Sequence, residues 1–432
     1  MEIISEFSSI KHNDGEHMTQ TKSKIWTKDF TLLTQAQMIN HLGDILYNVS
    51  IGFWVYKKTN SVSLMGLMAS IGLLVNMLVN PISGVIVDKL NRKKLMITAD
   101  LIQGSLILGV GILSLNNHLS VPVILVTAFI VSFISSFYHP SIMTTFVDLV
   151  KKEDIVQAQS IFSSINSLLG LIGKGLSGAL IVFFGVPTMI ILNGLSNLVS
   201  AFILKFIKIP HHPVSNEPIT YQSVIRDVIE GAKYSIQQPG LNVLMVCAIL
   251  ANLFGAGYGS LYIPMAFQKG LTEIEYGLFM MSATIAALIA AVALGAFKIP
   301  SRFRMSVFSV SFILSTLFSI FTFMSTGFIP FTGFNFVAEI FMVMGNTLLS
   351  TTILIASPRE RRATIFGFLS SFSLAGMAIS TLAYGYLAEI MDLSLISMIG
   401  VSISFFMLIP VIINPDIKKF MNTEEDNEPL AA

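Results

Sequence analysis

Long runs of hydrophobic residues alternate with short polar connections along almost the whole chain. Each run is long enough for a membrane-crossing helix of about 20 residues. Strands are much shorter, and an open sheet cannot expose its edges to lipid. The pattern therefore predicts an all-α polytopic membrane protein with twelve transmembrane helices, at residues 30–56, 62–87, 95–115, 121–146, 157–184, 187–207, 241–267, 273–297, 304–326, 329–354, 363–388 and 393–413.

One connection is longer than the others and divides the runs into two sets of six. It covers residues 208–240 and contains four prolines around a mildly amphipathic segment. We therefore expect an N-terminal six-helix half at 30–207, a cytoplasmic linker at 208–240 and a C-terminal six-helix half at 241–413. Residues 1–29 and 414–432 are expected to be cytoplasmic tails, and the first of these lacks the short apolar segment of a secretory signal.

Basic residues are unevenly distributed over the connections. If the N-terminus lies inside the cell, 22 of the 26 Lys and Arg residues fall on the cytoplasmic side and three, Lys57, Lys58 and Lys269, on the outer side, with Lys174 inside a helix. Cytoplasmic loops of membrane proteins carry an excess of Lys and Arg. The sequence thus predicts a multi-pass protein of the cell membrane with both termini in the cytoplasm.

Composition agrees with a membrane protein and narrows the function. The chain is 53% hydrophobic and 12% charged, whereas soluble domains carry about 25% charged residues. A net charge of +1 gives no reason to expect a nucleic-acid partner. We find no phosphate-binding loop ending in Gly-Lys-Ser/Thr and no nucleophile–base pair, so we expect neither an enzyme nor a bound cofactor.

The first hydrophobic run carries a polar stripe. Gln37, His41, Asp44 and Asn48 follow one another at intervals of four, three and four residues, which places them on one helical face. A carboxylate as deep as Asp44 is costly unless it faces a cavity or a partner. It either fixes helix packing by hydrogen bonds or responds to protons or cations in a central cavity. For His41 the sequence leaves two interpretations, a packed neutral side chain or a functional one.

Two further ionisable residues lie inside predicted helices. Lys174 belongs to a stripe of small and polar residues in the fifth run, and small residues let helices approach closely. It is either a structural ion-pair partner, for example of Asp44, or a group that takes part in coupling or substrate binding. Glu339 lies well inside the tenth run. It either hydrogen-bonds between helices or lines the cavity, with aromatic residues such as Tyr258 and Tyr262 nearby.

The connection after the second run reads Gly84-Val-Ile-Val-Asp88-Lys89-Leu-Asn91-Arg92-Lys93-Lys94. Five ionisable residues cannot lie in hydrocarbon, because each would cost ~3 kcal/mol or more. The segment is therefore predicted to be a tight, water-facing turn. Asp100 and Asp148 are expected to join Arg92 in a cytoplasmic charge cluster. Neighbouring His211 and His212 do not make a metal site by themselves, and none is predicted.

This turn closely resembles the signature loop between helices 2 and 3 of the major facilitator superfamily. Further features follow in the order of its macrolide-efflux branch of drug:proton antiporters, among them Gly43-Asp44, Pro81 and Pro140. The resemblance implies alternating access, with protons as the coupling ion, a small hydrophobic or amphipathic substrate and a functional monomer. It implies a cytoplasmic latch of Gly84, Asp88, Arg92 and Asp148, and a proton-coupling or substrate cavity with Asp44, His41, Lys174 and Glu339.

One position departs from the pattern of these antiporters. They carry a Gly-Pro pair in the fifth helix, and Lys174 stands where the proline is expected, within Gly173-Lys174-Gly175. This departure favours an alternative in which the protein exports an anionic metabolite or siderophore that Lys174 binds. A third hypothesis is a non-transporting membrane sensor with the same fold, but such a sensor should have a recognisable soluble output domain.

Overall fold

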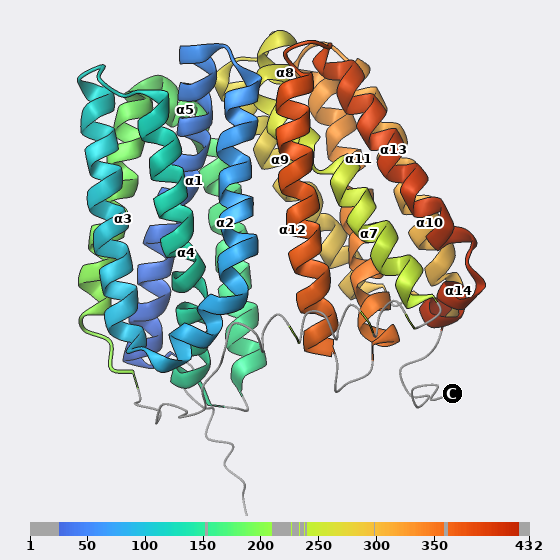
Figure 1. Cartoon of the computed structure of the whole chain (residues 1–432), viewed down its shortest axis with the longest axis horizontal. Coiled ribbons are helices and arrows are strands. Elements are labelled where there is room, and N and C mark those ends of the chain that lie inside the picture. The colour runs from blue at the N-terminus through green and yellow to red at the C-terminus, as the bar shows by residue number, and fades with distance from the viewer. Residues whose placement is uncertain are drawn as a thin grey trace, which may run out of the picture.

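A computed structural model of the chain describes residues 26–151, 154–209, 240–297, 299–357 and 362–422, together with the single residues Arg226, Lys233 and Gln237. Every regular element within these ranges is helical. The helices form two bundles that stand side by side, the N-terminal half in blue to green and the C-terminal half in yellow to red (Figure 1). The predicted linker lies almost entirely outside the described residues.

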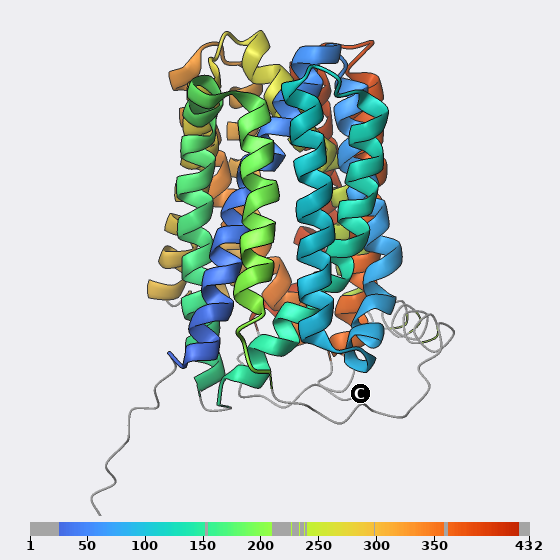
Figure 2. The same ribbon diagram turned by 90° about the vertical axis from the view of Figure 1, so that its left-hand side faces the viewer.

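Five continuous helices make up the N-terminal half. They are α1 (Lys28–Thr59), α2 (Val62–Lys89), α3 (Arg92–Leu115), α4 (Val121–Leu149) and α5 (Ile155–Leu204). Figure 2 views the molecule from the side of this half and shows its helices running upright, side by side.

The 50-residue α5 is two membrane-crossing limbs joined by a break. Gly185 has a φ of 78° and a ψ of 157°, and Pro187 follows two residues later. This backbone conformation is open to glycine and strongly disfavoured for residues with a Cβ atom. The chain therefore reverses at Gly185, and the two limbs correspond to the fifth and sixth predicted runs.

The C-terminal half begins with a helix that is interrupted rather than straight. It consists of α7 (Leu241–Gly255), the short 3₁₀ helix η2 (Gly257–Leu261) and α8 (Tyr262–Gln268), which together cross the bundle once. The remaining helices are α9 (Glu273–Ala296), α10 (Ser301–Met324), α11 (Phe328–Ala356), α12 (Arg362–Leu387), α13 (Leu393–Ile413) and the short α14 (Pro415–Asn422).

Twelve membrane crossings result, as the hydrophobic pattern predicts. By length and hydropathy alone, ten stretches of the described residues qualify as membrane spans, and one of these contains both limbs of α5. The remaining crossing is α1, whose polar stripe lowers its hydropathy. The helix α14 falls within the expected C-terminal tail and was not predicted.

The connection between α2 and α3 is as tight as its sequence predicts. Helix α2 ends at Lys89, and Asn91 caps α3 by accepting a hydrogen bond from the backbone N–H of Lys94 at 3.0 Å. Asparagine at this position satisfies one of the N–H groups that a helix start leaves unpaired. Only Leu90 and Asn91 separate the two helices, so the turn fixes their relative position closely.

The two halves touch at the end of the bundle that carries Lys57, called here the Lys57 end. A hydrophobic cluster there combines Phe53 and Met189 of the N-terminal half with Leu261, Phe279 and Phe331 of the C-terminal half. The opposite end carries the α2–α3 turn and is called the Arg92 end. In Figure 1 the ribbons of the two halves are nearest each other at the upper, Lys57 end.

Glycines permit the closest approach between the halves, where α5 meets α9. A Cβ atom at Gly178 would lie 1.9 Å from the backbone oxygen of Glu273, and one at Gly277 would lie 3.0 Å from the backbone oxygen of Gly175. Contacts this short leave no room for a side chain. The small-residue stripe of the fifth run is thus a helix–helix contact, as predicted, and it joins the two halves.

Polar contacts reinforce the Lys57 end. Lys57 of α1 forms an ion pair with Glu273 of α9. The Ser63 hydroxyl donates to the backbone oxygen of Gly385 at 2.9 Å, and that of Ser70 donates to the oxygen of Ala378 at 3.1 Å. These inter-half contacts come from the end of α1 and from α2 on the side of the N-terminal half.

Glu389 belongs to the same set of contacts. Its carboxylate accepts from the backbone N–H of Ser63 at 3.1 Å and from the Ser61 hydroxyl at 2.8 Å. These donors, at the start of α2, hold the pKa of Glu389 below its ordinary value. A carboxylate with a lowered pKa supports the folded contact at neutral pH and loses that support only as the pH falls through the lowered value. Glu389 therefore stays charged near neutral pH.

Because the α5–α9 contact has no space for a side chain, Gly178→Val is expected to separate the halves at the Lys57 end. Overpacking of this kind typically costs ~1–3 kcal/mol, which is enough to shift a conformational equilibrium about fivefold or more. The measurement is disulfide formation between Lys57→Cys and Glu273→Cys in a Cys247→Ala background. Cross-linking should be efficient with Gly178 and strongly reduced with Gly178→Val.

Gly170→Val is the matched control, because a Cβ atom at Gly170 would meet nothing within 4 Å. It introduces the same side chain into the same limb of α5 and should leave the cross-link intact. Equal cross-linking in the two valine variants would show that the glycine contact does not hold the halves together.

Candidate functional site

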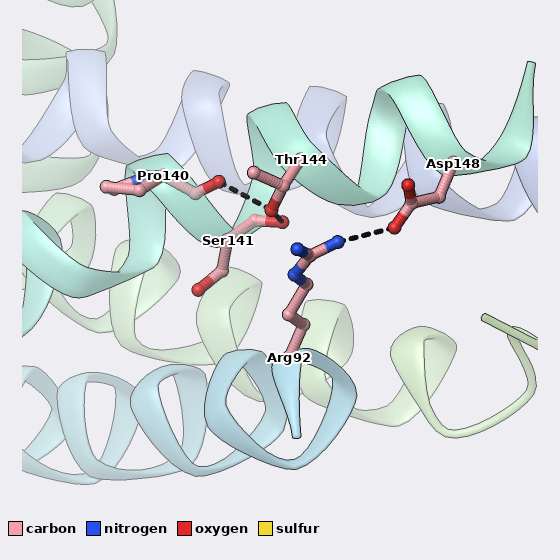
Figure 3. Close-up of polar contacts among 5 residues, drawn as sticks. All are labelled: Arg92, Pro140, Ser141, Thr144 and Asp148. Atoms are coloured by element: carbon pink, nitrogen blue, oxygen red, sulfur yellow. Dashed lines mark hydrogen bonds and ion pairs between the residues drawn. The ribbon is translucent and has the colours of Figure 1, made fainter. Parts of the chain in front are cut away.

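Arg92 and Asp148 form a largely buried ion pair at the Arg92 end. An Arg92 Nη atom lies 2.5 Å from an Asp148 Oδ atom, and the two side chains are 18% and 14% exposed. Figure 3 shows the guanidinium of Arg92 reaching from the start of α3 across to α4, with Asp148 beyond Thr144. Charge-assisted hydrogen bonds of this kind are stronger than neutral ones. The pair ties α3 to α4 within the N-terminal half.

Local sequence places both partners of this pair. Arg92 is the first residue of α3, directly after its capping Asn91, and Asp148 lies in the last turn of α4. Pro140 interrupts the backbone hydrogen bonding of α4, and the Thr144 hydroxyl donates to its backbone oxygen at 2.9 Å. Gly84 and Asp88, the other members of the predicted latch, lie near the end of α2, and their side chains fall outside the described part of the structure.

Three of the predicted cavity residues lie close together between the halves. The charge of Lys174, in the first limb of α5, acts on His41 of α1 and on Glu339 of α11. All three side chains are partly buried. We call His41, Lys174 and Glu339 the interface group, because they come from both halves and share one electrostatic environment.

Two tyrosines complete the C-terminal side of this group. The Tyr262 hydroxyl donates to the side-chain oxygen of Asn335 at 3.1 Å, one helical turn from Glu339. Glu339 also acts electrostatically on Tyr258 and Tyr262. Tyr258 lies on η2 and Tyr262 begins α8, so both residues that interact with Glu339 belong to the break in this helix. Aromatic rings next to a carboxyl group offer both apolar and hydrogen-bonding surface to a ligand.

Asp44, the fourth predicted cavity residue, has different neighbours. It lies beside Asn193 in the second limb of α5 and interacts electrostatically with Asp100 of α3. Its side chain is exposed although it sits in the middle of α1. The sequence suggests an ion pair of Lys174 with Asp44 or with another acid. In the structure, the charge of Lys174 acts on His41 and on Glu339.

Asp100 is the main correction to the sequence-based expectations. It does not join the Arg92 cluster but is fully buried among four helices. Its carboxyl group accepts hydrogen bonds from the Asn40 amide at 3.1 Å, the Tyr138 hydroxyl at 3.3 Å and the Ser200 hydroxyl at 2.6 Å. We call these four residues the Asp100 network. Asp100 lies eight residues into α3, about 12 Å along the helix from Arg92, too far for the predicted contact.

Sequence reasoning could not assemble this network. Asn40, Tyr138 and Ser200 lie in three different hydrophobic runs, and each is an ordinary polar residue in a membrane helix. The only available signal was Asp100 itself, a carboxyl group two turns into a hydrophobic run, where an unpaired charge is costly. Met96, one turn from Asp100 toward the Arg92 end, is fully buried in a hydrophobic cluster, and this burial separates Asp100 from the polar turn.

No three His, Cys, Asp or Glu side chains gather where they could hold a metal ion in the part of the chain that the structure describes. His211 and His212 of the predicted linker lie outside that part. Among the described residues, Lys174 and Glu339 belong to the interface group with His41, whereas Asp44 and Asp100 interact with each other.

Comparison with known proteins agrees with this architecture. The solved nucleoside transporter NupG is similar over 92% of this chain and 100% of its own, with a TM-score of 0.69 and 12% identity. A bacterial homologue of the iron transporter ferroportin, in an inward-facing state, is similar over 92% of this chain and 99% of its own, with a TM-score of 0.66 and 17% identity. At such low identities these likenesses show the fold alone.

Similar sequences include exporters. A putative bacilysin exporter, BacE of Bacillus amyloliquefaciens, is 26% identical over 48% of this chain and 50% of its own length. Macrolide efflux protein A of Streptococcus pyogenes is 23% identical over 58% of this chain and 60% of its own. The chain thus spans half to three fifths of these relatives. The MFS-type transporter YfiS of Bacillus subtilis is 24% identical over 88% of this chain and 89% of its own.

A sequence profile of the Major Facilitator Superfamily matches residues 33–381, which include most of both halves. The profile agrees with the two helical bundles, the short α2–α3 turn and the relatives described above. The chain belongs to the Major Facilitator Superfamily.

Proposed function

We propose that this transporter exports a small hydrophobic or amphipathic compound, of the macrolide-like antibiotic class, across the cell membrane in exchange for protons. The observation that carries the proposal is the interface group. It places a carboxyl group, a lysine and a histidine from both halves within electrostatic reach of one another. Ionisable residues inside membrane helices are expensive and mark substrate or ion pathways.

Proton exchange follows from the chemistry of this group. Glu339 from α11 and Lys174 from α5 belong to opposite halves, so their separation changes when the halves rock about a central site. Protonation of Glu339 removes its attraction to Lys174, and a substrate that enters between them changes the same interaction. Binding of protons and substrate is then coupled, because each biases the same two states.

The relatives support the choice of substrate. Two of them are named for export of an antibiotic, bacilysin in one case and macrolides in the other. Tyr258 and Tyr262 beside Glu339 offer aromatic surface that suits an amphipathic molecule. Lys174 supports a second candidate, an anionic metabolite or siderophore, because the lysine would bind its negative group. We expect the protein to work as a monomer.

The orientation follows from the charges of the connections. With both termini in the cytoplasm, the Arg92 end faces the cytoplasm and the Lys57 end faces outward. The structure would then be closed on the outer side, where the inter-half contacts are made. The cytoplasmic latch of Gly84, Asp88, Arg92 and Asp148 would set how readily the inner side closes in the other half of the cycle.

Export is tested with radiolabelled erythromycin in cells that lack their own macrolide exporters, with and without the protein, at two external pH values. Cells with the protein should accumulate less label, and a proton ionophore should abolish the difference. Glu339→Gln should reduce export by about tenfold or more, as expected when ~1.4 kcal/mol of coupling is lost. Glu389→Gln, which also neutralises a carboxylate but at the outer end, should retain ionophore-sensitive export.

A panel of anionic and cationic probes separates the two substrate candidates in the same assay. Selective loss of anion export in Lys174→Gln would favour the anionic metabolite. Equal accumulation of every probe in cells with and without the protein, at both pH values, would refute the proposal.

Orientation is tested by labelling single cysteines in a Cys247→Ala background with a membrane-impermeant maleimide. Asn91→Cys should react only after the cells are opened, because the α2–α3 turn is expected to face the cytoplasm. Lys58→Cys, at the opposite end, should react in intact cells. Labelling of position 91 from outside intact cells would reverse the proposed topology.

The Arg92–Asp148 pair is expected to matter for both transport and stability. Arg92→Gln or Asp148→Asn leaves a charged partner without its hydrogen bond, which typically costs ~1.5–3 kcal/mol. Each variant should unfold at a lower temperature in detergent and transport more slowly, and the double variant should lose less than the sum of the two. Lys94→Gln, an exposed neighbour, is the control for lost positive charge. Strictly additive losses would show that the pair is energetically unimportant.

A further inference from the structure

A buried carboxyl group of the N-terminal half has no role in the interface group described above. Asp100 is 0% exposed and receives hydrogen bonds from helices α1, α4 and α5. The described residues provide no cation within ion-pair distance of it. An ionised carboxylate held by neutral donors alone is expensive in a low-dielectric interior, whereas a bound proton removes the charge. The protonation state of Asp100 therefore decides how costly its burial is.

The hydrogen atoms of the network can be assigned from its donors. The Tyr138 hydroxyl accepts from the Gln37 amide at 2.9 Å and from the Asn40 amide at 3.2 Å. Because both of these groups donate to it, its own hydrogen is left for Asp100. The Ser200 hydroxyl and the Asn40 amide also donate to Asp100. In this arrangement Asp100 is an acceptor on both oxygens, as an ionised carboxylate would be.

The network also contains what a protonated Asp100 would need. The side-chain oxygen of Asn40 is buried and has no hydrogen-bond partner, while the nitrogen of the same amide lies 3.1 Å from Asp100. A half-turn of this amide would bring its oxygen to Asp100 as an acceptor. A carboxylic acid proton on Asp100 would supply the donor that this oxygen lacks. The Ser200 hydroxyl can likewise turn from donor to acceptor.

A second carboxyl group, that of Asp44, belongs to a residue with accessible surface in the middle of α1. Asp44 is exposed, interacts electrostatically with Asp100, and lies beside Asn193. Asn193, Asn197 and Ser200 follow at intervals of four and three residues, so they form one face of α5 from Asp44 to Asp100. The Asn193 amide nitrogen and the Asn197 amide oxygen are buried without partners. This face therefore has free capacity to donate and to accept.

We propose that Asp100 is a buried proton-binding group of the N-terminal half, reached through the exposed Asp44, and that it exchanges its proton during the transport cycle. The titratable groups that face it are Asp44 from α1 and Tyr138 from α4. The second limb of α5 presents only the neutral Asn193, Asn197 and Ser200. Because two like charges in one apolar region repel each other, the loss of a proton from Asp100 is linked to the charge of Asp44.

Helices α3 and α4 connect Asp100 to the Arg92 end. Tyr138 and Asp148 lie on the same helix, α4, with Pro140 between them, and Arg92 begins the helix that carries Asp100. Protonation alters the hydrogen bonds that hold α3 to α4 at Asp100, about three turns from the Arg92–Asp148 pair on α4. Asp100 therefore acts on the same two helices as this pair. The inference rests on the proposed proton coupling and identifies Asp100 as one of the groups that bind a proton.

Infrared difference spectroscopy of the purified protein without substrate tests the proposal. A protonated carboxyl group has a C=O stretching band that the carboxylate lacks, so the difference between spectra taken at about pH 5 and about pH 9 reports groups that titrate between them. Wild type should show a carboxylic-acid band that Asp100→Asn lacks. Glu389→Gln, a control with a charged outer carboxylate, should retain it. Ser200→Ala should shift its frequency, because it removes the 2.6 Å hydrogen bond.

An unchanged difference spectrum in Asp100→Asn would overturn the proposal, since a carboxyl group that only fixes packing keeps one protonation state. If Asp100→Asn does not fold, Ser200→Ala and Tyr138→Phe decide the matter. A band whose frequency neither variant alters would also overturn it. The infrared assay needs no substrate, so failure of the export experiments would not change its result. Conversely, proton-dependent export in a protein without this band would refute the role of Asp100 and leave the proposed function standing.

Discussion

The high free energy of a charge in hydrocarbon governs how this chain uses its ionisable residues. Each such charge costs ~3 kcal/mol or more in a membrane helix, and the sequence accordingly gathers Lys and Arg in the connections. The few exceptions inside helices are brought together by the fold. Lys174 lies within electrostatic reach of Glu339 and His41, and Asp100 is surrounded by three hydrogen-bond donors.

The contact between the halves is of a kind that can be broken and remade. At Gly178 the helices α5 and α9 meet backbone to backbone, without interlocking side chains. The polar contacts around it, Lys57 with Glu273 and Glu389 with Ser61 and Ser63, lie at the surface, where water can replace either partner. Exposed pairs contribute little net free energy. The Lys57 end is thus held by the buried hydrophobic cluster around Phe53 and Phe279, together with backbone contacts and exposed polar pairs.

The sequence predicted what depends on local pattern. Hydropathy and the Lys and Arg distribution indicated twelve crossings in two halves, and the small-residue stripe indicated a close helix contact. Local pattern does not predict contacts between hydrophobic runs that are distant in sequence. The position of Asp100 suggested a partner in the Arg92 turn, but its hydrogen bonds come from α1, α4 and the second limb of α5. Periodicity gives the face of a helix and not the helix it meets, so the sequence could not tell which acid lies within electrostatic reach of Lys174.

Helix α1 connects the two sets of ionisable residues. His41 belongs to the interface group, while Asn40 and Asp44, one residue before and three after it, belong to the surroundings of Asp100. A small rotation or tilt of α1 changes both environments at once, since its side chains are rigidly related within one turn. A proton bound at Asp100 would favour one position of α1, and a substrate beside Lys174 and Glu339 would favour one as well. Coupling in this transporter then requires only that the two preferred positions differ, because ligands that bias the same two-state element are linked in free energy.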